Sequence, residues 1–295
     1  MTPSREGGAG TPDAVRVNGV VAAEVSVIDR GLHYGDGLFE TIACANGRPR
    51  LLGRHLGRLA LGCRRLKLVP PDLQALESEV RELAATPSRA IVKILVTRGA
   101  ARARGYGVCG DETASRITLR YPWPDGGSAS AKEGVRVRLA STRLGENPAL
   151  AGLKHCNRLE QVLARAEWDD PGIAEALMFS SSGAVISGTM SNVFVVHDSR
   201  LLTPRLDRCG VAGIMRALIL EEAAQAAIPV VECRLEAATL EQARELFLSN
   251  ALWGVRPVRA LEGVALEPGN LTRQLQRRIA ARLAAAAREG AAGDA

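Results

Sequence analysis

The stretch that decides the fold is LAGLKHCNRLEQV, residues 150–162, which places one lysine, Lys154, just before the start of a helix. Lysine is scarce in this chain, because only 4 of its 38 lysines and arginines are lysines. Schiff-base chemistry needs an amine that can lose its proton, which lysine can do and arginine in practice cannot. If the chain holds an aldehyde cofactor, the residue that binds it covalently is one of four side chains.

Three of the four lysines have ordinary structural explanations. Lys67 ends an amphipathic helix, where a positive charge is favoured by the helix dipole, and Lys132 lies in a polar linker. Lys93 stands in the middle of the strand AIVKILV, where we expect an outward-pointing side chain. Lys154 is the one lysine that is left to explain.

The residues after Lys154 predict a capped helix. Asn157 can accept hydrogen bonds from amides of the first turn, and Glu160 follows three residues later, which resembles a capping box. We expect a helix from Asn157 to about Trp168, and we expect its cap to fix the direction of Lys154. Caps occur on every helix, so this feature alone does not make the lysine catalytic.

Length and composition describe a globular protein of two modest domains. A chain of 295 residues exceeds the size at which a single core stops growing. Hydrophobic residues make up 46% of it, and no run of about 18 apolar residues indicates a membrane span. Residues 1–14 are small and polar, so we expect a disordered lead-in and not a secretory signal. Residues 289–295 are expected to form a frayed tail.

Cysteine usage and charge narrow the function classes. The six cysteines form no CxxC pair and no cluster with the four histidines, which argues against a zinc site and a disulfide framework and favours the cytoplasm. The net charge is +6, but the arginines are scattered and aromatic residues make up only 3%, so no nucleic-acid surface is expected. The positive excess favours an anionic small molecule, such as a phosphorylated cofactor or a carboxylate substrate.

The first part of the chain, residues 15–121, predicts an α+β domain. Asn-Gly pairs at 18–19 and 46–47 predict two hairpins. A second helix at about 72–86 leads to the strands AIVKILVTRG and RITLRY. The first helix is predicted by one apolar stripe, formed by Leu52, Leu56, Leu59, Cys63 and Leu66, and it ends before Pro70.

A segment rich in Pro, Gly and Ser, residues 122–133, predicts a linker to a second domain over 134–288. Strands such as GVRVRLAS, EALMFS, NVFVV and ELFLS are grouped there, with further helices expected from Gly213 and near 271–288. Because the strands do not alternate with helices in repeating βα units, both domains are predicted to be α+β.

Two features suit a phosphate group. In DRCGVAGIMRALIL, residues 207–220, two glycines precede a helix whose free amides and dipole can bind phosphate without a charged side chain. Arg58, in RHLGRLALGCRRL, lies beside the apolar stripe, from where it can clamp a phosphate. Each feature also has a plain explanation, a turn in the first case and a solvated arginine in the second.

The order of the motifs resembles one enzyme family. It is similar to the fold type IV pyridoxal-phosphate enzymes, which include branched-chain aminotransferases, D-amino acid aminotransferases and 4-amino-4-deoxychorismate lyases. The resemblance covers about residues 15–285 and is closest to the lyases around Lys154 and in FLSNAL. The motifs are DRGLHYGDGLFET, RHLGRL, VTRG, GLKHCNRLEQV, SGTMSNVFVV, LLTPRLDRCGVAGIMR and FLSNALWGVRPV.

The resemblance implies a two-domain α+β fold of the D-amino acid aminotransferase type, with pyridoxal 5′-phosphate in the cleft between the domains, and a homodimer. It implies that Lys154 forms a Schiff base with the cofactor. Arg58, the amides of 214 and 215 and the turn at 250–251 are expected to hold the phosphate, and Arg158 to reach the ring hydroxyl. The cofactor-binding residues that it implies are Arg58, Lys154, Arg158, Ser187, Asn192, Ile214, Met215, Asn250 and Ala251.

The activity implied by the resemblance is a lyase that converts 4-amino-4-deoxychorismate to 4-aminobenzoate and pyruvate, on the route to folate. Lys154 would take the proton from the ring carbon that bears nitrogen, and Thr41 or a water would protonate the departing group. The candidates for binding the substrate carboxylates are His33, Arg98, Arg104 and Tyr106. An aminotransferase of the same fold is the nearest alternative, and a basic RNA-binding protein without a cofactor is an alternative of another class.

One position departs from the family pattern. The family usually carries a glutamate five residues before the signature asparagine, where it pairs with the protonated pyridine nitrogen, but this chain has Ser187. A hydroxyl holds that proton less firmly, so a delocalised carbanion is less stabilised. Transamination depends on long-lived delocalisation, whereas elimination needs the electrons only to pass to a leaving group. We therefore interpret Ser187 as favouring a lyase.

Overall fold

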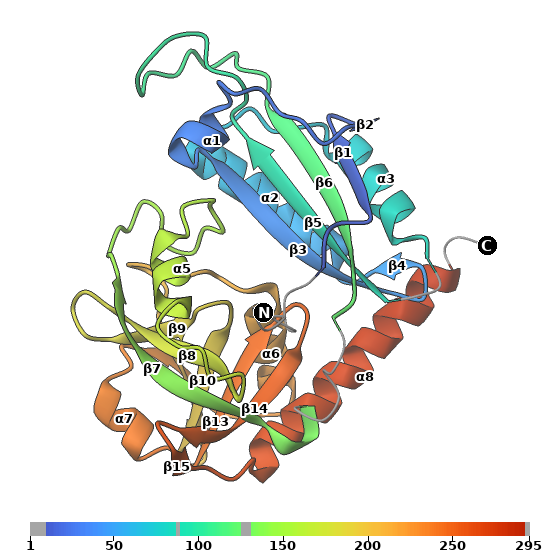
Figure 1. The fold of residues 1–295 in the computed structure, drawn as a ribbon. Coiled ribbons are helices and arrows are strands. Elements are labelled where there is room, and N and C mark those ends of the chain that lie inside the picture. Colours follow the sequence, from blue (N-terminus) through green and yellow to red (C-terminus); the bar gives the residue numbers. More distant parts are fainter. Residues whose placement is uncertain (1–9, 87–88, 125–130, 293–295) are drawn as a thin grey trace, which may run out of the picture. The chain divides into compact units, whose positions relative to one another are not determined.

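The computed structural model describes residues 10–86, 89–124 and 131–292 (Figure 1). It divides into two compact units: unit 1 is Met1–Gly126 with Lys154–Asn157, and unit 2 is Gly127–Leu153 with Arg158–Ala295. The sequence-based boundaries placed residues 154–157 in the second domain, whereas the structure places them in unit 1. Most of the predicted lead-in and the centre of the predicted linker, residues 1–9 and 125–130, lie outside the described residues.

Unit 1 is built on a six-stranded antiparallel sheet with the order β2-β1-β6-β5-β3-β4. Its strands are β1 (Ala14–Val17), β2 (Val20–Val21), β3 (Gly37–Ala45), β4 (Arg48–Pro49), β5 (Ala90–Thr97) and β6 (Ser115–Pro122). Its helices are α1 (Arg30–Tyr34), α2 (Leu52–Leu66) and α3 (Leu73–Ala84).

Both predicted Asn-Gly hairpins are confirmed. In the β1–β2 hairpin Val17 pairs with Val20, and in the β3–β4 hairpin Ala45 pairs with Arg48, so each loop has two residues. The loop residues have positive φ angles, 52° and 87° in the first turn and 53° and 73° in the second. Asparagine and glycine are the residues that tolerate this backbone, and the resulting turn matches the twist of the strands.

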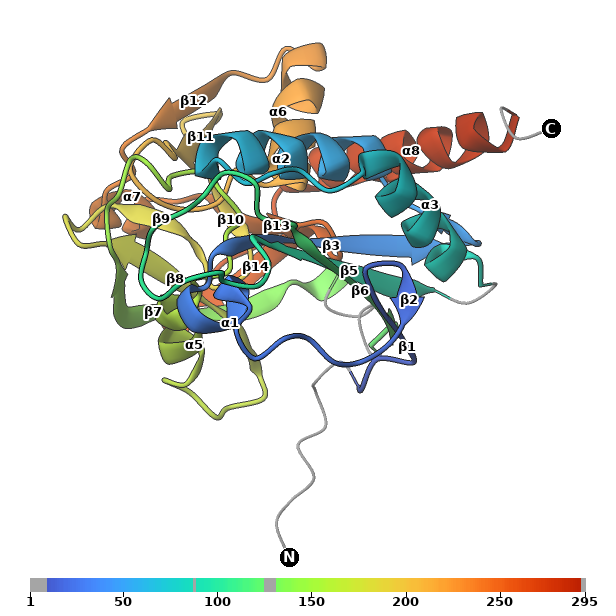
Figure 2. The same cartoon turned by 90° about the horizontal axis from the view of Figure 1, so that it is seen from above.

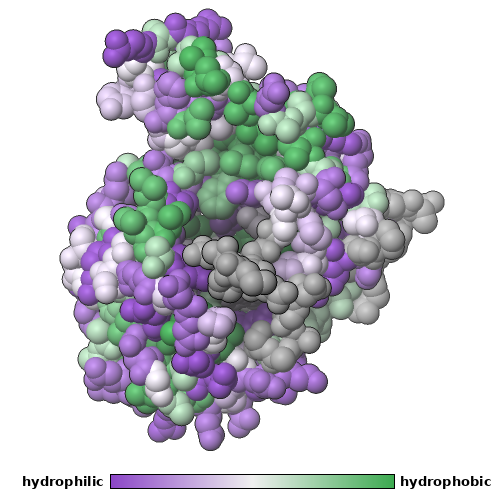
Figure 3. Space-filling view, in the orientation of Figure 1, coloured by the Kyte–Doolittle hydropathy of each residue, from purple (hydrophilic) through white to green (hydrophobic). Residues whose placement is uncertain are grey.

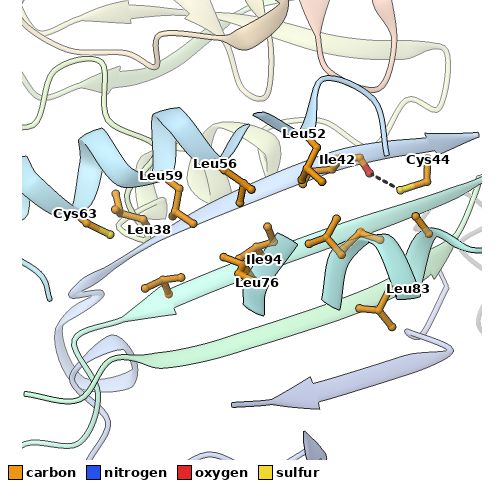
Figure 4. Packing of buried hydrophobic residues seen from close by; sticks show 14 of the residues in the cluster. Leu38, Ile42, Cys44, Leu52, Leu56, Leu59, Cys63, Leu76, Leu83 and Ile94 are labelled. Atoms are coloured by element: carbon orange, nitrogen blue, oxygen red, sulfur yellow. Dashed lines mark hydrogen bonds between the residues drawn. The ribbon is translucent and has the colours of Figure 1, made fainter. Parts of the chain in front are cut away.

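The two longer helices of unit 1 cover one face of its sheet (Figure 2). The predicted apolar stripe of α2 packs there against Leu38, Ile42 and Cys44 of β3, and α3 adds Leu76 and Leu83 (Figure 4). Neither α2 nor α3 covers the other sheet face. Many side chains of this face are only half-buried, and hydrophobic residues are visible on this part of the surface (Figure 3). By strand register and alternation, the half-buried residues Phe39, Leu95, Ile117 and Leu119 belong to this face.

Unit 2 is built on a nine-stranded mixed sheet with the order β12-β11-β10-β13-β14-β7-β8-β9, in which β15 also pairs with β14. The pairs β7–β8, β7–β14 and β11–β12 are parallel. The strands are β7 (Val135–Leu144), β8 (Ile173–Ser180), β9 (Val185–Gly188), β10 (Asn192–His197), β11 (Arg200–Pro204), β12 (Val230–Cys233), β13 (Glu245–Asn250), β14 (Gly254–Leu261) and β15 (Val264–Ala265).

The helices of unit 2 are α5 (Leu159–Arg165), α6 (Ile214–Gln225), α7 (Ala237–Glu241) and α8 (Asn270–Ala292). The centre of the sheet is fully buried, and the rings of Phe194 and Phe247 stack there with their centroids 4.9 Å apart. The frayed tail predicted from residue 289 is wrong at its start, because α8 continues to Ala292. Alanine has the highest helix propensity, and the alanine-rich end of this segment sustains the helix.

The predicted α+β class is confirmed in both units, since helices pack on grouped strands in each. No helix among the described residues combines the length and the apolar composition that crossing a lipid bilayer requires.

Candidate active site

Lys154 lies on a short extended segment that lengthens the sheet of unit 1. The Phe39 amide donates to the carbonyl of Lys154 at 3.0 Å, and the Cys156 amide donates to the carbonyl of Gly37 at 2.9 Å. Between these bonds Leu38 and His155 form an antiparallel bridge. This pairing with the start of β3 explains why the lysine belongs to unit 1 and not to the unit that contains its neighbours in sequence.

The Lys154 side chain lies against an aromatic ring. Its Nζ is 4.1 Å from the centroid of the Phe39 ring, and the lysine is half-buried. The negative face of a phenyl ring attracts an ammonium group, which gives the lysine a defined direction. Thr41 follows two residues after Phe39 on β3, so its side chain shares the sheet face that α2 and α3 do not cover.

The predicted capping box after Lys154 is wrong. Helix α5 begins at Leu159 with Arg158 as its N-cap residue, and no side chain caps it. The Asn157 side chain donates from Nδ2 to the carbonyl of Gly35 at 3.1 Å, so it holds the segment to unit 1. Gly35 has a φ of 62°, and a Cβ there would lie 2.7 Å from Oδ1 of Asn157, so both the backbone and the space require glycine.

Arg58 lies in a buried network on the helix-covered face of the same sheet. Its Nε and Nη2 donate to the two carboxylate oxygens of Glu40 at 2.7 and 2.5 Å, and His55 Nδ1 is 2.6 Å from that carboxylate. Burial alone would raise the pKa of Glu40, but the hydrogen bonds from His55 and Arg58 outweigh it and hold the pKa below its ordinary value of 4.5. The network fixes the position of the Arg58 guanidinium.

Unit 2 presents a helix N-terminus that suits a phosphate. Helix α6 begins at Ile214, and its N-cap residue Gly213 supplies no side-chain hydrogen bond. The amides of Ile214 and Met215 therefore have no intrahelical acceptor and no side-chain cap. A Cβ on Gly213 would lie 2.0 Å from Oδ1 of Asn192. The side chain of Asn192, the signature asparagine, therefore closely approaches the start of the helix.

Polar groups at the start of β10 and at the end of β13 can make further hydrogen bonds. Asn192 donates from Nδ2 to the carbonyl of Val211 at 2.9 Å and pairs across the sheet with Ser249. The Ser249 hydroxyl is fully buried and has no partner among the described residues. Asn250 accepts from the amides of Leu252 and Trp253 at 3.0 and 2.8 Å, which shapes the turn that includes Ala251.

Two further predicted residues lie in unit 2. Arg158 donates from Nη2 to the carbonyl of Leu153 at 3.3 Å. Ser187 lies on β9 opposite Met178 of β8 and is buried, with 8% of its surface exposed. The roles assigned to these two residues, and to Asn192, Ile214, Met215, Asn250 and Ala251, remain predictions.

A buried carboxylate, Glu175, supports the turn before Asn192. Its oxygens accept from the amides of Thr189 and Met190 at 2.9 and 3.1 Å and from Oγ of Ser191 at 2.9 Å. Burial raises the pKa of this carboxyl group, and the hydrogen bonds oppose that effect. Glu175 therefore fixes the backbone from which the signature asparagine projects.

The four candidate substrate residues have different environments. Arg98 is buried and bound in place: Nε and Nη2 donate to Asp36 at 2.7 and 3.1 Å, and its Nη atoms also donate to the carbonyls of Leu66 and Lys67 at the end of α2. Burial opposes ionisation of Asp36, but the hydrogen bonds from Arg98 and Arg30 lower the pKa of its carboxyl group. These contacts give Arg98 a structural role.

The other three candidates lie near the surface. Tyr106 is 83% exposed, and its ring lies 5.2 Å from that of Tyr34, between centroids. Arg104 is exposed in the same loop, and His33 has Nε2 2.7 Å from the carbonyl of Val27. Their roles with substrate also remain predictions.

Sequence reasoning missed Glu40, His55 and Glu175. One signal was available for Glu40. It alternates with Phe39 and Thr41 along a buried strand, so its carboxylate lies on the core face. A buried carboxylate needs a basic partner. His55 and Arg58, three residues apart on one helix face, are that partner. No comparable signal exists for Glu175, because its partners are mainly backbone amides.

Comparison with known proteins agrees with this geometry. The family model for amino-transferase class IV matches residues 37–261. The chain belongs to the class IV aminotransferase family. Among curated relatives of this class IV protein, aminodeoxychorismate lyase from Vibrio harveyi is 34% identical over 264 residues, which cover 88% of this chain and 97% of the relative.

Solved structures of the class IV family show the same fold. A 4-amino-4-deoxychorismate lyase from Pseudomonas aeruginosa has a TM-score of 0.85 and 48% identity, and the match covers 90% of this chain and 97% of that one. A branched-chain amino acid aminotransferase from Escherichia coli has a TM-score of 0.78 and 25% identity, with 90% and 93% covered. The class IV fold is thus shared by lyases and aminotransferases, and sequence identity is higher to the lyase.

Proposed function

We propose that this chain is a pyridoxal-phosphate-dependent lyase that converts 4-amino-4-deoxychorismate to 4-aminobenzoate and pyruvate. The observation that carries the proposal is the 48% identity to a 4-amino-4-deoxychorismate lyase over nearly the whole chain, against 25% for an aminotransferase of the same fold. Ser187, where the family usually has glutamate, supports elimination over transamination. The activity belongs to the synthesis of folate.

The residues present fit pyridoxal 5′-phosphate. The N-terminus of α6, which has no side-chain cap, the lack of a side chain at its N-cap residue Gly213 and the buried Ser249 hydroxyl, which has no partner among the described residues, all suit a phosphate-bearing ligand in unit 2. In unit 1, Lys154 would hold the cofactor through its ε-amine, and Arg58 would offer a fixed positive charge to the phosphate. When bound, the cofactor supplies the electron sink for breaking bonds next to an amine.

Two side chains of unit 1 would move the protons. The Lys154 amine takes the proton from the ring carbon that bears nitrogen, which allows the ring to become aromatic. The carbon–oxygen bond to the enolpyruvyl arm then breaks, and its electron pair leaves with the oxygen. Thr41 would deliver a proton to the departing arm, which becomes pyruvate; its position on the same sheet face as the Lys154 side chain supports this role.

Borohydride reduction followed by peptide mapping tests the cofactor and its attachment together. We expect hydride to fix the cofactor to Lys154, and the visible absorption band of the protein to disappear in Lys154→Ala. Label on another residue, or none, would contradict the assignment. A second assay separates the activities: 4-amino-4-deoxychorismate should give 4-aminobenzoate, whereas amino donors with 2-oxoglutarate should give little product. A reversed outcome would identify an aminotransferase.

The protein is further proposed to act as a homodimer in the cytoplasm. Large hydrophobic side chains are exposed in unit 1 at Val21, Val27 and Leu32 and in unit 2 along α5 at Leu159 and Val162. Exposed large apolar side chains, where they gather on a surface, are typical of a protein interface. The six cysteines, all among the described residues, are free thiols, which suits a reducing compartment. Light scattering should give twice the mass of one chain, and Val27→Asp should lower it; a single-chain mass for the wild type would contradict the dimer.

A further inference from the structure

The loop between β5 and β6 carries two of the candidate substrate residues, Arg104 and Tyr106. Figure 1 shows this loop extending past the ends of the two strands. Both side chains are exposed. A side chain on such a loop can bind a ligand well only if the loop backbone is held in one place, because a ligand that must first order its own site is bound more weakly.

One side chain holds the middle of this loop. Nη1 of Arg30 donates to the carbonyls of Gly105 and Gly107 at 3.1 and 3.2 Å, and Nη2 donates to the carbonyl of Tyr106 at 3.3 Å. Three consecutive carbonyls therefore converge on a single guanidinium. Among the described residues, no other hydrogen bond reaches the backbone of residues 102–108.

Other groups hold the two ends of the loop. The Ala101 amide donates to the carbonyl of Ile28 at 2.9 Å, and Glu112 accepts from the amide of Gly110 at 3.0 Å. These bonds stop short of the two candidate substrate residues. Without the guanidinium, the middle of the loop would lose its hydrogen bonds to the rest of unit 1 while its ends stay in place.

Arg30 is itself a rigid support. It is buried on α1, and its Nε donates to Asp36 at 2.9 Å. Its guanidinium carbon lies 5.0 Å from the centroid of the Tyr34 ring, which is in turn 5.2 Å from the ring of Tyr106. A planar guanidinium makes several hydrogen bonds at fixed angles, which a lysine amine cannot do. Because the side chain is buried, Arg30 acts on a ligand only through the loop that it holds.

We propose that Arg30 is a positioning residue for substrate binding. It holds the backbone of residues 105–107 so that the side chains of Arg104 and Tyr106 are presented to the anionic substrate. This inference rests on the proposed lyase function. The Lys154 segment has its own hydrogen bonds to β3, so loss of Arg30 should weaken substrate binding and leave the chemical step nearly intact.

Two measurements on Arg30→Met test the inference. Trypsin cleaves after arginine in segments that open, and Arg102 and Arg104 lie in the loop. We expect cleavage at these two sites to be about tenfold faster than in the wild type, because the loop opens without unfolding of the whole unit. The KM for 4-amino-4-deoxychorismate should rise about tenfold or more, while kcat stays within about threefold.

Two further variants separate positioning from stability. Arg30→Lys keeps a positive charge beside Asp36 but cannot reach three carbonyls, so it should recover most of the resistance to urea without recovering the KM or the protection from trypsin. It also carries the comparison if Arg30→Met does not fold. Arg116→Met is the matched control, because Arg116 is a half-buried arginine of unit 1 that donates to Glu79 on α3 and not to the loop. It should lower stability and change neither KM nor cleavage in the loop.

The other outcomes overturn a stated part of the inference. Unchanged cleavage in both Arg30 variants would show that Arg30 does not hold the loop. Faster cleavage with an unchanged KM would show that the loop does not present substrate residues, and an equal rise of KM in Arg116→Met would reduce the role of Arg30 to stability. A wild-type enzyme that makes no 4-aminobenzoate would refute the proposed function instead, and the trypsin comparison would still decide whether Arg30 holds the loop.

Discussion

Arg58 donates through two nitrogens to both carboxylate oxygens of Glu40, at 2.7 and 2.5 Å, inside a core where only 1% of Glu40 is exposed. A forked pair of this kind fixes the plane of the guanidinium as well as its position. An arginine expected to hold a phosphate is therefore oriented before any ligand arrives, and Glu40 is the residue that orients it.

Glu40 should make stability depend on acid. Its pKa is lowered in the fold, so the stabilisation is complete above the ordinary value of 4.5 and is lost as the pH falls through the depressed value. Glu40→Gln should lower the free energy of unfolding at neutral pH by about 3 kcal/mol, because Arg58 loses a buried partner, and should flatten the acid dependence. Urea unfolding across a pH series measures both. Glu82→Gln, at an exposed pair with Arg16, should change stability by less than about 1 kcal/mol.

Loss of the Arg98 side chain should lower the stability of the fold much more than loss of the Arg104 side chain. Arg98→Met leaves the half-buried Asp36 with one remaining arginine and frees two carbonyls at the end of α2, so it should cost about 3 kcal/mol of stability. Arg104→Met removes an exposed side chain and should change stability by less than about 0.5 kcal/mol. Chemical denaturation of both variants is the measurement. Equal stability of the two would contradict the structural role of Arg98.

Gly213→Ala should weaken cofactor binding. The new Cβ would meet Oδ1 of Asn192 at 2.0 Å, so the asparagine or the first turn of α6 must shift. We expect the dissociation constant of pyridoxal 5′-phosphate to rise about tenfold or more, as the amides move from their ligand positions. Titration of the apoenzyme, followed by visible absorbance, measures it. Unchanged affinity would show that this close approach does not shape the site.

Gly57→Ala is a second glycine-to-alanine substitution, and we expect it to be favourable because it should stabilise the fold. Gly57 is exposed on α2, and nothing lies within 4 Å of the Cβ that alanine would add. Replacing a glycine inside a helix by alanine should raise the free energy of unfolding by about 0.5–1 kcal/mol. Thermal or urea unfolding of the variant tests this, and a loss of stability would mean that α2 needs flexibility next to Arg58.

Ser187→Glu should shift the reaction toward transamination. A carboxylate at this buried position holds a proton on the pyridine nitrogen more firmly than a hydroxyl does, which stabilises a delocalised carbanion. The ratio of transaminase to lyase rates should rise about tenfold. The ratio, and not either rate alone, is the measurement, because it cancels partial loss of folded enzyme. An unchanged ratio would refute the interpretation of Ser187.

Local signals in the sequence predicted most of the elements. The Asn-Gly pairs fixed the two hairpins, because few other residues adopt their backbone angles, and the apolar stripe predicted α2. The capping box predicted for α5 is wrong for a physical reason: the Asn157 side chain donates instead to a carbonyl distant in sequence, that of Gly35. Local spacing carries no information about such a partner.

The residues of the candidate site were likewise predictable where the signal is local in sequence and not where the partner is distant. Lys154 was reachable by elimination among four lysines, and the helix start at Ile214 by its glycines. Lys93 was interpreted as outward-pointing, because a strand pattern gives the face of a residue but not what lies over that face. The partner of Arg98 could not be foreseen either, since Asp36 is 62 positions away in sequence.

The contact of Lys154 with the Phe39 ring bears on inhibitor chemistry, because Lys93 shares it, with Nζ 5.7 Å from the centroid of that ring. Half of all the ε-amines in this chain converge on a single phenyl ring, while the remaining surface is basic almost entirely through guanidinium groups, which do not form stable imines. A small aromatic aldehyde that also bears an acidic group would find both of its partners beside this ring. One lysine amine would form an imine with the aldehyde, and the other would pair with the acidic group. The scarcity of competing nucleophilic amines would then give such a compound selectivity that a lysine-rich protein could not provide.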